Sequence, residues 1–159
     1  MLLSAAVTSR LQHQHESLQD QLKGYNENQL RQRPPSGKWS PFEQMAHLAA
    51  YQLVFLQRMK QVEQGNNPLF ERYIGDDDPV FLEYRELPLQ QLLENLYIQR
   101  FIIINYLTAL PEAALRNTGR HPKYGEFTLA EWTEFFLLHE GHHLFHLFLL
   151  TRELTIAAQ

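Results

Sequence analysis

Apolar side chains recur with helical spacing in four stretches of the chain, at residues 4–23, 40–64, 88–111 and 128–151. Within each stretch the apolar positions return every three or four residues, which is the period of an amphipathic helix. Prolines and glycines fall mainly in the segments between the stretches, where they favour turns. The pattern therefore predicts four helices, each about 20 residues long.

Two of these stretches begin with strong helix-start signals. Ser40 and Glu43 form the ends of a capping box, and Pro41 stands at the first helical position between them. Thr128 and Glu131 form a second capping box at the start of the last stretch. We therefore expect the second and fourth helices to begin at these positions.

Two shorter segments have some strand character. The run 102–104 is three isoleucines, which favour strands by propensity, but the long periodic stretch around it favours helix. The segment 80–84 alternates apolar and polar residues and is the one place where a short strand is plausible.

Four helices in a chain of 159 residues predict one all-α domain over 1–159, folded as a four-helix bundle. The helices at 40–64 and 128–151 are expected to run antiparallel. The long connection at 65–87 is expected to cover one end of the bundle. Its acidic run, 75–79, lacks the spacing of a calcium loop and is read as a solvated turn.

Composition excludes several classes of function. The formal net charge is −4, which gives no basic stripe for nucleic acid. The chain has no cysteine, so it has no disulfide, thiolate zinc site or protein thiol nucleophile. No stretch approaches the roughly 18 apolar residues of a membrane span, so we expect no membrane partner and, by default, a cytoplasmic protein.

The chemistry of the chain concentrates in a histidine cluster of the fourth helix. His139 and His143 are four residues apart, so a helix places both imidazoles on its inward, apolar face. His47 lies on the inward face of the second helix at a matching depth and is the natural third ligand. Three imidazoles with one open position suit a catalytic divalent metal, and zinc, nickel and iron are not distinguished by these ligands.

Two neighbouring side chains are candidates for catalytic roles. His146 lies at the edge of the inward arc and is read as a fourth ligand, a residue that orients a ligand, or a wall of the pocket, with the last two favoured. Glu140 completes a formal H-E-x-x-H sequence with His139 and His143, in which a glutamate is the general base. An all-helical chain argues against a metalloprotease fold, so Glu140 is either a base near the metal or a surface carboxylate.

The other histidines and a second apolar stripe are expected to lie outside the inward face. His13, His15 and His121 are expected at the surface, and His142 is expected to face solvent or an interface. The second stripe lies on the fourth helix outside the inward arc, and a helix that is apolar on two sides needs two partners. In so small a protein this favours a homodimer, and the alternative is a helix enclosed on both sides within a monomer. The residues of the stripe are Phe135, Leu138, Phe145 and Leu149.

Two motifs resemble a known family. Residues 38–48, K-W-S-P-F-E-Q-M-A-H-L, resemble the entry into the second helix of DinB/YfiT-like proteins, and residues 127–146 resemble their last helix, which carries H-x-x-x-H. The resemblance covers nearly the whole chain and implies a bundle, often dimeric, that binds a divalent metal. Carried over, the ligands are His47, His139 and His143. Members often have glutamine where this chain has His146.

The resemblance also implies a range of activities. Relatives include S-transferases that use bacillithiol or mycothiol, a mycothiol-dependent maleylpyruvate isomerase and metal-dependent hydrolases. The leading expectation is therefore a metal-dependent transferase that joins a low-molecular-weight thiol to a small electrophile, and the thiol is then a co-substrate. A hydrolase and a non-catalytic metal-binding dimer are the alternatives. Tyr51 and Arg58 share the inward face with His47 and either line the pocket or serve packing and an ion pair.

Overall fold

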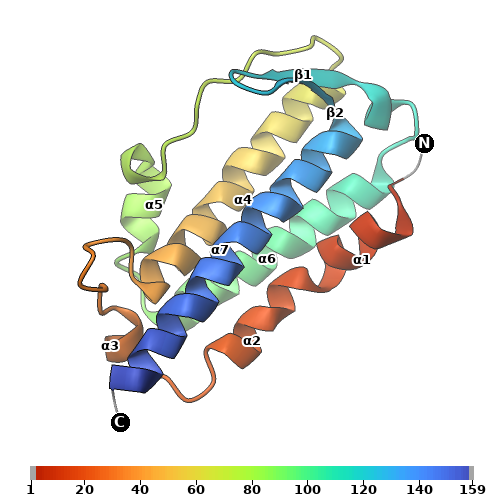
Figure 1. Ribbon diagram of the computed structural model, residues 1–159. Helices are drawn as coiled ribbons and strands as arrows, with labels where there is room; N and C mark the ends of the chain where they lie inside the picture. The colour runs from red at the N-terminus through yellow and green to blue at the C-terminus, as the bar shows by residue number, and fades with distance from the viewer. Residues whose placement is uncertain (1–2, 158–159) are drawn as a thin grey trace.

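The computed structural model describes residues 3–157, so positions 1–2 and 158–159 of the expected domain lie outside the described residues. The helices pack side by side as a four-helix bundle (Figure 1). They are the broken helix α1 (Ala5–His13), η1 (Gln14–Glu16) and α2 (Ser17–Gln21), and the long helices α4 (Pro41–Glu63), α6 (Leu89–Ala109) and α7 (Leu129–Ala157). The four-helix bundle expected from the pattern is confirmed.

The two helices that carry the histidine cluster begin where their capping boxes stand. In α4 the backbone N–H of Glu43 donates to Ser40 Oγ (3.2 Å), and the N–H of Ser40 donates to a Glu43 carboxylate oxygen (2.9 Å). In α7 the N–H of Glu131 donates to Thr128 Oγ1 (3.2 Å), with the reciprocal bond to the Glu131 carboxylate (2.7 Å). These bonds satisfy the unpaired N–H groups of each first turn, so both helix starts are set locally. The helices run antiparallel, as expected (Figure 1).

The expected first helix is broken, and a short helix that was not expected follows it. A 3₁₀ turn, Gln14–Glu16, separates α1 from α2, and Ser17 Oγ donates to the carbonyl of Gln14 (2.9 Å). His15 lies in this turn, and its side chain is only 7% exposed. The expectation of a surface His15 is therefore wrong. The short helix α3 (Glu27–Leu30) packs near the start of α4.

The connection between α4 and α6 contains helix rather than strand. Asp78 accepts the N–H of Val80 (2.9 Å), and Pro79 then starts the short helix α5 (Pro79–Tyr84). An N-cap aspartate followed by proline favours helix, and this local signal decides against the possible strand at 80–84. The 3₁₀ turn η2 (Gly75–Asp77) precedes α5 and lies against the bundle.

A β-hairpin precedes α7 and departs from the all-helical expectation. Its strands, β1 (Thr118–His121) and β2 (Gly125–Thr128), pair antiparallel after the 3₁₀ turn η3 (Ala114–Arg116). Gly125 has a φ of 84°, which a side-chain-bearing residue rarely adopts, so glycine allows the tight reversal. Strands this short give too few residues for a period of two to stand out in the sequence.

The core consists of two hydrophobic clusters along the bundle axis. One cluster is centred on Phe55, Trp132 and Phe136, and the other contains Leu48 and Leu144. On α7, His139 and His143 lie between the residues of the two clusters, and on α4 His47 lies one turn before Tyr51, the first α4 residue of the first cluster. The functional side chains are thus held between two packed regions, which restricts their motion. No helix in residues 3–157 is both long enough and apolar enough to cross a membrane.

Candidate metal centre

Three imidazoles from two helices converge inside the bundle. His139 Nε2 lies 3.2 Å from His47 Nε2 and 3.2 Å from His143 Nε2. One ligand atom from each of the three residues lies within 4.8 Å of the other two. The structure therefore brings together the three residues that the sequence selected.

The spacing of the nitrogens fits a shared ion. Two nitrogen ligands at about 2.0–2.1 Å from a tetrahedral zinc ion stand about 3.3 Å apart. The two 3.2 Å separations in this cluster match that value. Three protein nitrogens leave one position of a tetrahedral ion for water or a substrate atom, which is the arrangement of a catalytic site.

A glutamine sets the orientation of one ligand. His143 Nδ1 donates a hydrogen bond to Gln44 Oε1 (2.7 Å). Because the amide oxygen is an acceptor, His143 carries its hydrogen on Nδ1 and presents the lone pair of Nε2 to the centre of the cluster. Gln44 is three residues before His47 on α4, so both side chains face the same way.

Burial keeps the imidazoles neutral. Loss of hydration, with a smaller contribution from the neighbouring histidines, lowers the pKa of His47, His139 and His143 to about 3 in each case. At neutral pH the lone pairs are therefore not blocked by protons. Nδ1 of His47 and Nδ1 of His139 are buried and have no hydrogen-bond partner among the described residues. The Nε2 atoms of the same two rings lie 3.2 Å apart, so these are the nitrogens that would ligate a shared cation.

The segment between α4 and α5 packs directly on His47. A Cβ atom added to Gly75 would lie 2.7 Å from Trp39 and 2.8 Å from His47 Nδ1, so only glycine fits there without a shift. Trp39 Nε1 donates to Asp76 Oδ1 (2.9 Å), which ties this segment to the start of α4. The acidic run thus shapes the site through hydrogen bonds, and none of its aspartates belongs to the metal-ligating group found among the described residues.

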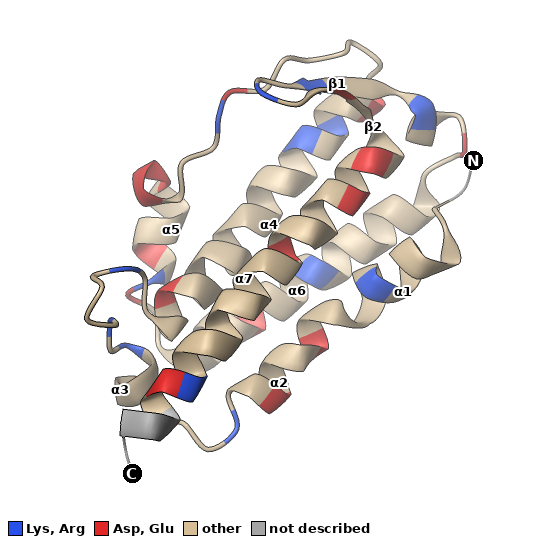
Figure 2. Ribbon diagram, viewed as in Figure 1, with Lys and Arg blue, Asp and Glu red and all other residues tan. Residues whose placement is uncertain are grey.

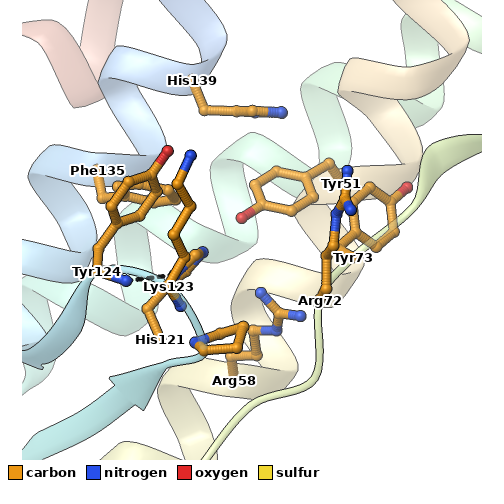
Figure 3. Close-up of a pocket in the computed structure, with 10 residues that line it drawn as sticks. Tyr51, Arg58, Arg72, Tyr73, His121, Lys123, Tyr124, Phe135 and His139 are labelled. Atoms are coloured by element: carbon orange, nitrogen blue, oxygen red, sulfur yellow. Dashed lines mark hydrogen bonds between the residues drawn. The ribbon is translucent and has the colours of Figure 1, made fainter.

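A cavity of about 540 Å³ borders His139 (Figure 3). Tyr51 forms part of its wall and packs on His139 with ring centroids 4.2 Å apart. Figure 3 shows the Tyr51 hydroxyl pointing into the cavity. Burial raises the pKa of Tyr51, so this hydroxyl keeps its proton and can donate a hydrogen bond at neutral pH. The histidine cluster therefore has an adjoining space large enough for a small molecule.

A second hollow, of about 450 Å³, reaches the cluster from the side of His143. Its lining includes His142 and His146 together with Gln44 and Trp39. Each of the two hollows thus contains one histidine of the cluster in its wall.

Comparison with known proteins identifies the family and the fold. A family model described as the DinB superfamily matches residues 10–147. The chain belongs to the DinB superfamily. Its fold is similar to that of YfiT from Bacillus subtilis, described as "a probable metal-dependent hydrolase with an unusual four-helix bundle topology". The two chains are 18% identical, the TM-score is 0.75, and the match covers 94% of this chain and 86% of YfiT. Comparison with curated proteins gave no match.

In this DinB-superfamily protein the Glu140 side chain is buried, contrary to the surface-carboxylate interpretation. The carboxylate is only 3% exposed and forms an ion pair with Arg100 of α6. Its other oxygen accepts from Gln14 Nε2 (2.9 Å). On a helix, residues next to each other point about 100° apart, so Glu140 faces α1 and α6 while His139 faces α4. Glu140 is thus not a surface carboxylate, and both of its oxygens are engaged by side chains of other helical segments.

His146 is a wall residue of the second hollow and is not among the three clustered ligands. The His146 ring packs against the ring of His142, one turn earlier on α7, with ring centroids 4.5 Å apart. This placement corresponds to the pocket-wall interpretation. The expectation for His142 also agrees, since its side chain is exposed.

Several residues near the cluster were not identified as site residues from the sequence. Gln44 could have been found, because it shares a helix face with His47 and can accept a hydrogen bond. The others come from the connection 65–78 and the β-hairpin, where nothing in the local pattern points to His139. They are Arg72, Tyr73, His121, Lys123 and Tyr124. His121, expected at the surface, is half-buried in the cavity wall.

Proposed function

We propose that this protein is a divalent-metal-dependent enzyme that joins a low-molecular-weight thiol, through its sulfur atom, to a small electrophile. The observation that carries the proposal is the ligand-like spacing of the three imidazoles beside a cavity that reaches His139. A closed structural site would have four protein ligands and no adjoining space. The geometry therefore favours an enzyme over a non-catalytic metal-binding protein.

A metal held by His47, His139 and His143 would supply a Lewis acid that lowers the pKa of a thiol or water at its open position. The surrounding residues have separate tasks. Gln44 holds His143 in the ligating orientation through its hydrogen bond. The Tyr51 hydroxyl can donate a hydrogen bond to a developing negative charge on the electrophile. The aromatic walls of the cavity displace water from the reacting atoms.

Two features support conjugation of a thiol over hydrolysis. The chain contains no cysteine, so a sulfur nucleophile must come from a second molecule. The residues that line the cavity include no aspartate or glutamate, and Glu140 is engaged by Arg100. Activation of water at a metal commonly uses a carboxylate base, whereas a thiol loses its proton readily near neutral pH once its pKa is lowered.

Hydrolysis is the second candidate, and the similarity to YfiT favours it. YfiT has the same fold over most of both chains and is described as a probable metal-dependent hydrolase. A metal-bound hydroxide can attack an ester or amide without a carboxylate base when the metal lowers the pKa of water enough. The metal cluster is the same in both proposals, and they differ in whether a thiol is required.

An assay with two substrates separates these activities. We expect protein loaded with zinc, nickel or iron to conjugate monobromobimane to a low-molecular-weight thiol at a rate on the order of a hundredfold above the metal-free protein. Bimane fluorescence measures the conjugation, and release of para-nitrophenol from para-nitrophenyl acetate without thiol measures hydrolysis. Metal-dependent ester hydrolysis without any thiol-dependent conjugation would contradict the thiol-conjugating activity and support the hydrolase alternative.

We also propose that the second apolar stripe of α7 binds a second copy of the chain. Leu138 is 60% exposed and Phe145 is 58% exposed, whereas Phe135 turns toward the cavity. A large exposed apolar patch is typical of an interaction surface. We expect Phe145→Glu to shift the protein from dimer to monomer in size-exclusion chromatography with light scattering, because a buried unpaired carboxylate opposes association. An unchanged mass would contradict this contact, and Glu153→Gln is a matched surface control.

A further inference from the structure

The cavity beside His139 is lined by positively charged side chains that form no ion pair with the described carboxylates. Arg58, Arg72 and Lys123 all line it, and the lining contains no aspartate or glutamate. Among the described residues, none of these three cations has a carboxylate oxygen within 4.0 Å. The ion pair expected as one reading of Arg58 is therefore not formed within this part of the chain.

The three cations come from separate segments that meet at one end of the bundle. Arg58 lies on α4, Arg72 on the connection that follows α4, and Lys123 in the turn of the β-hairpin. Figure 2 shows lysine and arginine on all three segments in this region, although the whole chain has a formal net charge of −4. Convergence of separate segments on one cavity distinguishes this arrangement from cations scattered over a surface.

The donors in the cavity remain available to a ligand. Arg58 donates one hydrogen bond to the carbonyl of Glu71 (2.8 Å) and lies over the ring of Phe70 at 5.1 Å, which orients its guanidinium. His121 Nδ1 accepts the backbone N–H groups of Lys123 (3.0 Å) and Tyr124 (3.1 Å). His121 therefore carries its hydrogen on Nε2 as a further donor.

The electrostatic surroundings agree with this reading. Burial lowers the pKa of His121, and the positive charges of Arg58 and Lys123 lower it further. The walls between these donors are aromatic and come from Tyr51, Tyr73, Tyr124 and Phe135. The cavity thus combines cationic donors with flat apolar surfaces, which suits an organic anion better than a neutral or cationic molecule.

We propose that this cavity binds the substrate through an oxyanion group, a carboxylate or a phosphate, that contacts Arg58, Arg72 and Lys123. Guanidinium groups bind such anions through paired, charge-assisted hydrogen bonds. His139 belongs to the same wall, so the body of an anion held here lies beside the metal cluster. The inference rests on the proposed function, because the cavity is a substrate site only if the histidine cluster is the reactive centre.

Calorimetric titration of metal-free protein tests the proposal. Phenyl phosphate and benzoate serve as probes for the two oxyanions, and benzyl alcohol is the neutral control. We expect at least one anion to bind wild type about tenfold more tightly than benzyl alcohol. We expect Arg58→Gln with Arg72→Gln to weaken anion binding by about tenfold or more, with Lys123→Gln as an independent second variant. Circular dichroism confirms that the variants are folded.

Lys23→Gln with Arg152→Gln is the matched control, since it removes the same charge near the ends of α2 and α7, where both residues line a separate hollow. This control should bind the anions as wild type does. The proposal is overturned if the cavity variants and the control bind equally, or if neither anion exceeds benzyl alcohol. Because the titration uses no metal, this failure is distinct from failure of the proposed function, which would appear as absence of metal binding or of metal-dependent activity.

Discussion

Replacing His139 by alanine is expected to abolish stoichiometric metal binding. The Nε2 atom of His139 lies 3.2 Å from the Nε2 atoms of both other histidines, so it occupies the middle of the ligand set. Binding at four-ligand structural zinc sites amounts to about 10–16 kcal/mol, so each ligand contributes several kcal/mol. Loss of one of three imidazoles should therefore weaken affinity by about a hundredfold or more. His47→Ala and His143→Ala should behave alike.

Metal content after reconstitution with zinc and gel filtration measures this effect. We expect about one zinc per wild-type chain and less than about a tenth in each ligand variant. His142→Ala and His146→Ala are matched controls, because both lie on the same turns of α7 but outside the cluster. Gln44→Ala should give an intermediate result, with affinity about 10- to 100-fold lower, since the orientation of His143 is lost. Equal zinc in wild type and all three ligand variants would disprove the assignment.

The second large effect concerns stability. Replacing Glu140 by alanine is expected to destabilise the protein by about 3–5 kcal/mol, the usual cost of leaving a buried charge without its partner. Arg100 is fully buried, and besides Glu140 its guanidinium donates to Gln52 Oε1 (3.0 Å) and the carbonyl of Leu11 (3.1 Å). One cation thereby connects α1, α4, α6 and α7 at the centre of the bundle.

Urea unfolding of the metal-free protein gives the free energy of unfolding without the stabilisation that a bound ion adds. The double variant Arg100→Met with Glu140→Leu should be less destabilised than Glu140→Ala, because it removes both charges together. Glu140→Gln separates this role from the general-base role suggested by H-E-x-x-H. We expect it to lower stability while the zinc content and the activity of the folded protein stay near wild type. A catalytic loss of about a hundredfold or more with unchanged stability would instead identify Glu140 as a catalytic base.

Much of the fold could be predicted from local signals. The starts of α4 and α7 follow from capping boxes in which both partners are within four residues, so no distant contact is needed to define them. Periodicity similarly identified α6, despite its isoleucine run. The hairpin at 118–128 and the break between α1 and α2 were missed, because short elements provide few periodic positions and depend on packing.

The candidate site likewise contains some residues that local signals identify and others whose positions depend on packing. His139 and His143 are one helical turn apart, and His47 lies at a matching depth of an antiparallel neighbour, so helical geometry alone proposes the cluster. Glu140 shows the limit of this reasoning. Its position beside His139 suggested chemistry at the metal, but a neighbouring residue on a helix points in another direction. Only the position of Arg100, 40 residues earlier on α6, shows what the carboxylate contacts.

The sequence by itself determined the bundle, the antiparallel pair of helices and the three histidines, because each depends on the repeat of a helix. Tertiary structure alone decided that the Glu140 carboxylate pairs with Arg100. It also decided that the hairpin and the connection after α4 reach the site, so that Arg58, Arg72 and Lys123 share a cavity with His139. These outcomes depend on how loops pack against helices. Loop paths follow from side-chain contacts between segments far apart in the chain, which no local periodicity records.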